Sequence, residues 1–358
     1  TCKTKPVVRE NREYFFIERV MMYKDWKRKG RKRSGRRPWR YIPAAGIVAV
    51  FAAVLMLYGV SRFAGSEHSS FLSGYGDRIL AMERVQPNIE LSGLNSEAAI
   101  LLRVSDGQVL AQMNQEKRIY PASMTKMMTC IVAVESIDDL ESEIRLPEEI
   151  FPALYEEGAS MAGFLPGEHV KIVDLLYGII LPSGGECSMA VAEYAAGSGE
   201  AFVEMMNEKA RELGMENTHF ENATGLQNEN HYSTVKDLAV LLQYALQNST
   251  FEEIFCSREH LAAPTDGHPE GLMLRSSMFR LQEDWTVGKG KGEIRGGKTG
   301  FTDEAGLCLA SEAMIGDEKY IAVTAGAEGD HSTEPYHVMD AFYLYGQLDN
   351  RWQAVKEE

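Results

Sequence analysis

The sequence predicts an α+β fold in which both ends of one domain build an antiparallel sheet and the middle forms a helical lobe. Residues 98–114, AAILLRVSDGQVLAQMN, are two branched apolar runs about a Ser-Asp-Gly turn, a pattern typical of a β-hairpin. Over residues 123–247, apolar residues recur at spacings of three and four, which indicates helices. Strand-like segments return over 292–302, 306–316 and 318–328. The helices therefore either cover the shared sheet or form a second lobe beside it.

The chain before this domain is divided by charge and by hydropathy. Residues 1–41 hold 15 of the 37 Lys and Arg residues but only 4 of the 52 Asp and Glu residues, although the whole chain has a net charge of −15. Residues 42–60, IPAAGIVAVFAAVLMLYGV, carry no charge. A helix of this length spans roughly 28 Å, about the hydrocarbon thickness of a bilayer. We therefore expect one N-terminal transmembrane helix behind a basic head, and no nucleic-acid partner.

The basic residues before the apolar run predict its orientation. Lys and Arg are retained on the cytoplasmic side, so we expect residues 1–41 in the cytoplasm and the chain after about Ser61 outside the cell membrane, as a single-pass protein. Residues 61–91 are rich in small residues and lack a long period, which predicts a stalk before a domain at 92–350. The alternative for 42–60 is a buried helix of a soluble protein. A cleaved signal peptide is disfavoured because GVSRFAG poorly matches a small-x-small cleavage site.

The stretch YPASMTKMMTC, residues 120–130, places a serine and a lysine three positions apart at a predicted helix start. Pro121 marks the helix entry, so Ser123 lies in the first turn and Lys126 lies one turn later on the same face. A serine hydroxyl becomes nucleophilic when a neighbouring base takes its proton, and a desolvated lysine can be that base. The backbone N–H groups of the helix start can stabilise an oxyanion. Alone the motif is weak evidence, because serine is a common helix cap.

Two later stretches change the interpretation of this motif. LPSGGEC, residues 181–187, is a Gly-rich turn between two helical patterns, and RGGKTGFTDEAG, residues 295–306, places a lysine and a threonine on a strand. S-x-x-K, S-D-N and K-T-G form the signature set of penicillin-binding proteins and class A β-lactamases. Residues 123–126 and 298–300 match two members of this set, and residues 183–185 match the third in part.

With these motifs, residues 92–346 resemble the serine-type D-alanyl-D-alanine carboxypeptidases, the low-molecular-weight penicillin-binding proteins of the penicilloyl serine transferase superfamily. The resemblance also rests on EEGASMAGFLPGEHVKIVDLLYGIILPSGGE and NATGLQNENHYSTVKDLAVL, which follow in the family's order. It implies a helical lobe against an antiparallel sheet, in agreement with the fold predicted above. It also implies that 92–350 is the catalytic domain.

The resemblance assigns a role to each residue that matches the family's motifs. Ser123 would attack the peptide carbonyl between two D-alanines, with Lys126 as its base. Ser183 would relay a proton to the leaving amine. Lys298 and Thr299 would hold the terminal carboxylate of the substrate, or the equivalent carboxylate of penicillin.

The backbone around the K-T-G glycine would complete the substrate site. The N–H groups of Ser123 and Phe301 would form the oxyanion hole, beside Gly300. Where the family usually has Asn, this chain has Gly185, so the side-chain amide that would hold the substrate peptide is missing. We interpret this departure as altered substrate fit, and we expect Gly185→Asn to preserve folding and to alter the acylation rate.

The implied activity is removal of the terminal D-alanine from peptidoglycan stem peptides, with β-lactams as acylating inhibitors and with neither a metal ion nor an organic cofactor. A D,D-endopeptidase with the same machinery is the nearest alternative. A class A β-lactamase is disfavoured because no E-x-x-L-N stretch lies between Ser183 and Lys298. Intact Ser123, Lys126 and Lys298 argue against a non-catalytic wall-binding relative. His231 is expected to be a loop or capping residue, because a lysine already fills the role of base.

Overall fold

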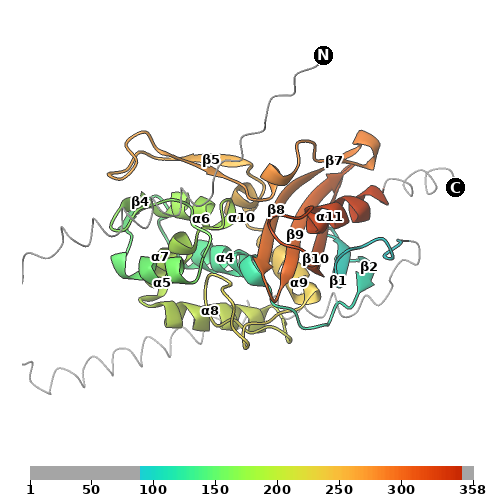
Figure 1. Ribbon diagram of the computed structural model, residues 1–358, viewed down its shortest axis with the longest axis horizontal. Coiled ribbons are helices and arrows are strands. Elements are labelled where there is room, and N and C mark those ends of the chain that lie inside the picture. The colour runs from blue at the N-terminus through green and yellow to red at the C-terminus, as the bar shows by residue number, and fades with distance from the viewer. Residues whose placement is uncertain (1–88, 349–358) are drawn as a thin grey trace, which may run out of the picture. The chain divides into compact units, whose positions relative to one another are not determined.

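A six-stranded antiparallel sheet runs through the domain and carries helices on both faces (Figure 1). The computed structural model describes residues 89–348, which fall within the unit Gly65–Glu358. The strand order is β2-β1-β10-β9-β8-β7. The strands are β1 Ala98–Arg103, β2 Val109–Met113, β7 Thr286–Val287, β8 Gly292–Thr302, β9 Gly306–Ile315 and β10 Glu318–Ala327. The predicted basic head, the predicted transmembrane helix and nearly all of the predicted stalk lie outside the described residues, and the domain bounds 92 and 350 stay predictions.

The two ends of the domain meet where β1 pairs with β10. The register of this antiparallel pair runs from Ala98 opposite Ala325 to Arg103 opposite Tyr320. The hairpin predicted near the start is β1–β2, and the three strands predicted near the end are β8, β9 and β10. The sequence pattern therefore predicted the α+β class and the origin of the sheet in both ends of the domain.

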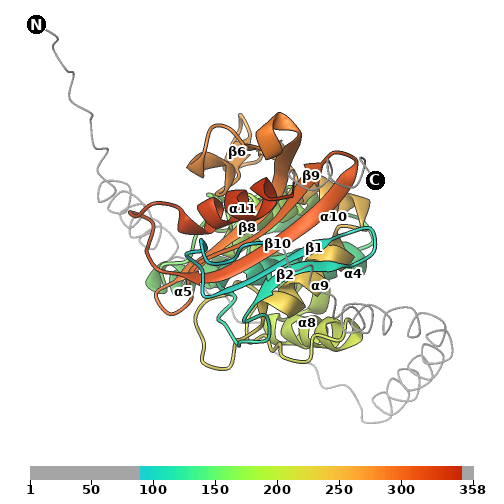
Figure 2. The same ribbon diagram turned by 90° about the vertical axis from the view of Figure 1, so that its right-hand side faces the viewer.

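Strand β1 is apolar on both of its faces because both faces of the sheet are covered. Ile100 and Leu102 belong to the core shared with the helical lobe, whereas Leu101 belongs to a second core under α11, Tyr336–Gly346. Figure 2 shows α11 lying along one face of the sheet. Leu101 and Tyr345 of α11 are both fully buried there. The sheet is thus an interior layer, which explains the continuous apolar run in β1.

The helical lobe surrounds α4, Lys126–Ser136, whose residues are buried without a break from Lys126 to Ala133. The other helices of the lobe are α5 Phe151–Glu156, α6 Ile172–Ile180, α7 Gly185–Ala196, α8 Gly199–Glu212, α9 Val235–Ala245 and α10 Ser249–Phe255. The 3-10 turns are η1 Ala122–Thr125, η2 Glu148–Ile150, η3 Phe279–Leu281 and η4 Gly288–Gly290. Between residues 89 and 348, every helix is too short or too polar to cross a membrane.

Two small antiparallel sheets were not predicted from the sequence. They are β3 Glu143–Arg145 with β4 His169–Lys171, and β5 Glu259–Ala262 with β6 Leu272–Arg275. Strands of this length are too short to show a clear alternating pattern. Contacts distant in sequence hold the β5–β6 hairpin on the lobe: His260 Nε2 lies 2.6 Å from Asp174 Oδ1, and His268 Nδ1 lies 2.7 Å from Glu168 Oε1.

Candidate active site

Ser123 lies in the tight turn η1 that leads into α4, and its side chain is half-exposed. Ala122, directly before it, has a left-handed backbone with φ 45°, which is uncommon for a residue other than glycine. Two glycines let other segments approach this turn closely. A Cβ atom at Gly225 would lie 1.9 Å from the Ala122 carbonyl oxygen, and one at Gly300 on β8 would lie 3.3 Å from the Ser123 nitrogen. The loop before residue 226 and the strand β8 therefore fix the position of Ser123.

Lys126 is the first residue of α4, and its side chain reaches back to the serine. Its Nζ lies 3.2 Å from Ser123 Oγ and 2.5 Å from the Thr224 carbonyl oxygen. Only 3% of the residue is exposed. Burial lowers the pKa of Lys126 to about 8, and the Glu186 carboxylate acts in the opposite direction. The amine is therefore partly neutral near physiological pH, as a general base requires.

A second hydroxyl and a second lysine meet where the lobe contacts the sheet. Ser183 lies between α6 and α7 in a left-handed conformation with φ 67°. Lys298 Nζ donates to Ser183 Oγ at 2.9 Å and to the Thr299 carbonyl oxygen at 2.9 Å. Lys298 is fully buried on β8, and burial together with the charge of Lys126 holds the pKa of Lys298 well below its ordinary value. The predicted second and third motifs therefore lie at this seam.

The predicted site residues thus come together from three separate segments. Gly300 brings the backbone of β8 to the N–H of Ser123, and Phe301 is the next residue of that strand. The Phe301 ring packs on His331, with ring centroids 4.8 Å apart. A hydroxyl beside a partly neutral amine, next to a strand backbone that can offer N–H groups, is an arrangement suited to acyl transfer through a serine ester.

The comparison with known families agrees with this chemistry. Residues 83–329, more than half of the chain, match the peptidase S11 family, D-alanyl-D-alanine carboxypeptidase. The chain belongs to this family. D-alanyl-D-alanine carboxypeptidase DacF of Bacillus subtilis strain 168 is 36% identical over 236 residues, which are 65% of this chain and 57% of DacF. D-alanyl-D-alanine carboxypeptidase DacC of Escherichia coli K12 is 31% identical over 272 residues, which are 73% of this chain and 63% of DacC. The chain thus spans less than two thirds of the length of these curated S11 relatives.

Solved structures share the fold of this S11 chain. The crystal structure of the Streptomyces K15 DD-transpeptidase aligns with a TM-score of 0.64 at 24% identity, over 73% of this chain and 100% of that chain. The D-alanyl-D-alanine carboxypeptidase from Mycobacterium tuberculosis H37Rv aligns with a TM-score of 0.63 at 24% identity, over 73% of this chain and 94% of that chain. The domain therefore has the transpeptidase-like α+β fold.

Gly185, the third residue of the partly matched S11 motif, is the first residue of α7. Its N–H donates to the Ser160 carbonyl oxygen at 2.7 Å. A Cβ atom at this position would lie 3.0 Å from Leu154 Cδ2 and 3.3 Å from Ala159 Cβ. The chain after α5 therefore packs directly on the start of α7, and the missing side chain makes room for it. A direct contact between Gly185 and substrate stays a prediction.

One group that sequence reasoning missed in this S11 site is a backbone carbonyl. Asn222 Oδ1 accepts from the N–H groups of Thr224 at 3.1 Å and Gly225 at 2.7 Å. This turn orients the Thr224 carbonyl so that it accepts from Lys126. The segment NATGLQ contributed to the family resemblance, but a carbonyl contact made by the main chain leaves no residue pattern of its own.

Two buried titratable side chains support the same region. Glu186 is fully buried, which raises the pKa of its carboxyl group, and its Oε1 accepts from the Gly163 N–H at 2.8 Å. His231 Nδ1 accepts from the Glu221 N–H at 3.2 Å, so its Nε2 carries the proton toward Thr125 Oγ1 at 2.8 Å. Burial lowers the pKa of His231 to about 4. His231 therefore holds the turn that carries Ser123.

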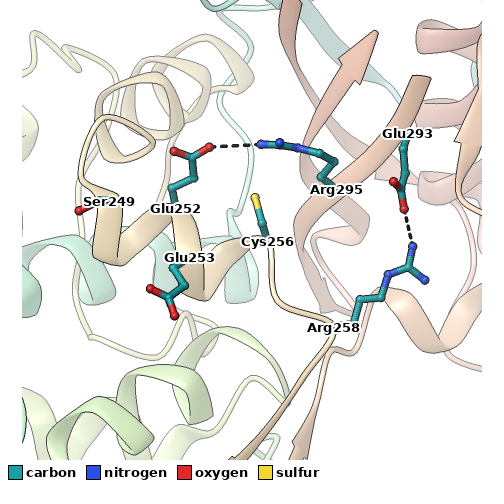
Figure 3. Close-up of a pocket in the computed structure, with 7 residues that line it drawn as sticks. All are labelled: Ser249, Glu252, Glu253, Cys256, Arg258, Glu293 and Arg295. Atoms are coloured by element: carbon teal, nitrogen blue, oxygen red, sulfur yellow. Dashed lines mark hydrogen bonds and ion pairs between the residues drawn. The ribbon is translucent and has the colours of Figure 1, made fainter. Parts of the chain in front are cut away.

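A charged pocket of about 480 Å³ lies between α10 and the neighbouring strand β8, and none of the predicted site residues lines it (Figure 3). Arg295 Nη2 lies 3.2 Å from Glu252 Oε1 of α10 and 3.2 Å from Oε1 of the fully buried Glu312 on β9. Arg295 comes three positions before Lys298 on the same strand. These ion pairs therefore fix the strand that carries the K-T-G motif of the S11 family.

Proposed function

We propose that this protein is a serine-type D-alanyl-D-alanine carboxypeptidase that removes the terminal D-alanine from peptidoglycan stem peptides. The observation that carries the proposal is the 3.2 Å separation between Lys126 Nζ and Ser123 Oγ, in a site where burial lowers the pKa of the lysine to about 8. Membership of the S11 family supports the substrate class.

In the first half-reaction, neutral Lys126 takes the proton of Ser123, and the serine oxygen attacks the carbonyl carbon of the penultimate D-alanine. The carbonyl oxygen becomes an oxyanion, which the N–H groups of Ser123 and Phe301 stabilise. The C–N bond then breaks, and the proton held by Lys126 passes through Ser183 to the departing amine, which leaves Lys126 neutral. The products are free D-alanine and a peptidyl ester on Ser123.

In the second half-reaction, water attacks the ester carbonyl while Lys126, again neutral, accepts its proton. The ester C–O bond breaks and Ser123 recovers its hydroxyl, so that the peptide leaves one residue shorter. A β-lactam acylates the same oxygen, but its amine stays attached to the acyl group after the ring opens. The penicilloyl ester therefore keeps its fragment in the site and hydrolyses slowly.

The test uses the purified chain with a pentapeptide that ends in D-Ala-D-Ala and with a fluorescent penicillin. We expect release of D-alanine and a long-lived covalent adduct on Ser123. Ser123→Ala should abolish both, whereas Ser249→Ala, an exposed serine on α10, should leave both unchanged. Rapid turnover of penicillin would favour a β-lactamase, and cleavage of cross-linked dimers alone would favour an endopeptidase. A folded protein without an adduct would favour a wall-binding relative.

We also propose that residues 42–60 anchor the enzyme in the cell membrane, with the basic residues 1–41 in the cytoplasm and the catalytic domain outside. The uncharged stretch and the cluster of Lys and Arg before it support this topology. The proposal places the catalytic domain on the side of the membrane where peptidoglycan lies.

A further inference from the structure

Ser277, which follows β6, connects two of the motifs of the site. Its N–H donates to the Leu181 carbonyl oxygen at 2.8 Å, two residues before Ser183. Its Oγ lies 2.8 Å from Thr299 Oγ1 on β8. Because Lys298, next to Thr299, donates to Ser183 at 2.9 Å, these contacts close a ring between the helical lobe and the sheet.

The neighbouring residue holds Ser277 in place. Met278 is fully buried, and a Cβ atom at Gly297 on β8 would lie only 2.2 Å from its Sδ. The main chain at 277 is bonded to Leu181, so the segment is fixed both to the lobe and to the strand. The main chain therefore places the Ser277 hydroxyl opposite Thr299, where the two oxygens are hydrogen-bonded.

Together, the hydroxyls of Ser277 and Thr299 can offer one hydrogen-bond donor to a ligand. Each hydroxyl has one proton, and when one donates to the other, only one proton of the pair remains for a ligand. Both side chains are half-buried, so a ligand can reach them, whereas Lys298 is fully buried and already donates to two oxygens. A donor in such a chain is strengthened by the hydrogen bond that it accepts. Whichever oxygen donates within the pair, the other hydroxyl is free to donate to a ligand, and a carboxylate oxygen is the acceptor that forms the strongest hydrogen bond with it.

We propose that Ser277 is a further specificity-determining residue, which acts with Thr299 as a hydroxyl pair to recognise the free carboxylate at the substrate's C-terminus. This inference rests on the proposed function and names the residue through which the enzyme distinguishes an acid from a neutral ester. Ser277 was not among the residues that the sequence motifs indicated.

The test compares two probes that leave the same acyl group on Ser123. One is an N-acyl-D-Ala-D-Ala peptide with a free carboxylate, and the other is the matching N-acyl-D-alanine p-nitrophenyl ester, which has none. We expect Ser277→Ala to lower the acylation rate constant for the peptide about 10-fold, the loss of one good hydrogen bond, and to leave that for the ester nearly unchanged. Ser277→Thr keeps a hydroxyl and should restore the ratio of the two rates. Ser249→Ala serves as the control.

The ratio of the two rates does not depend on the fraction of folded enzyme, so it separates recognition from stability. An unchanged ratio in Ser277→Ala, whether both rates fall together or neither falls, would overturn the inference and leave the proposed function intact. A wild-type chain that reacts with neither probe would overturn the proposed function, and this inference with it.

Discussion

The carbonyl oxygen of Thr224 lies 2.5 Å from Lys126 Nζ and accepts a hydrogen bond from it. A neutral amine has two protons and one lone pair. With one proton engaged by Thr224, the lone pair can face Ser123 Oγ, 3.2 Å away. The carbonyl thus orients the amine that we propose as the base, and the Asn222 side chain shapes the turn around Thr224 that presents this carbonyl.

The first prediction concerns the pH dependence of acylation. Burial lowers the pKa of Lys126 to about 8, so its neutral fraction rises as the pH rises through this value. The acylation rate constant with a fluorescent penicillin should therefore be about half-maximal near pH 8 and reach a plateau at higher pH. Lys126→Arg should abolish the reaction, because arginine stays charged, whereas Lys117→Arg, at an exposed position, should not. A rate that stays constant through this range would exclude Lys126 as the base.

The second prediction concerns Gly185 and revises the expectation that Gly185→Asn preserves folding. The new Cβ would lie 3.0 Å from Leu154 and 3.3 Å from Ala159, so we expect overpacking to cost about 1–3 kcal/mol of unfolding free energy. Gly199→Asn is the matched control, because Gly199 is also the first residue of a helix and a Cβ there would contact nothing within 4 Å. Urea denaturation measures both variants. Equal unfolding free energies of the two variants would show that the chain after α5 moves aside to accommodate the new side chain at 185.

The third prediction compares two arginines of the charged pocket (Figure 3). Arg295→Gln leaves the fully buried Glu312 without its ion-pair partner and should cost about 3 kcal/mol. Arg258 pairs with Glu293 at 2.6 Å, but both side chains are about half-exposed, so Arg258→Gln should cost less than about 1 kcal/mol. Thermal and urea unfolding of the two variants give the comparison. Similar losses in both would contradict the role assigned to the buried carboxylate.

The fourth prediction concerns topology. Protease added to intact cells should release the domain beyond about Ser61, while an epitope placed within residues 1–41 should become accessible only after lysis. The basic residues before the apolar stretch are the physical reason. Substituting Gln for Arg36, Arg37 and Arg40 removes part of this positive charge and should weaken the orientation preference. A domain that is protected from protease in wild-type cells would contradict the proposed orientation.

The sequence was most informative where chemistry requires a fixed residue type at a fixed spacing. Ser123, Lys126 and Lys298 could be singled out because the S-x-x-K and K-T-G patterns follow in order, and the long strands β8, β9 and β10 could be predicted from their apolar patterns. Ser277 could not, since a single hydroxyl after a short strand has no signal until tertiary packing places it opposite Thr299. Gly185 could be seen as a departure, but the sequence could not show that Leu154 and Ala159 lie against it.

The pairing of β1 with β10 also determines when the domain can complete its fold during synthesis. The turn with Ser123 is fixed by the loop before residue 226 and by β8, and the contact between Ser183 and Lys298 also requires β8. The first strand remains without its main partner until β10 arrives. Such non-local pairing is slow and exposes an unpaired strand edge in the meantime. A chain interrupted before β10 would therefore have an incomplete sheet and be prone to aggregate, so the proposed activity would appear only when synthesis of the domain is nearly finished.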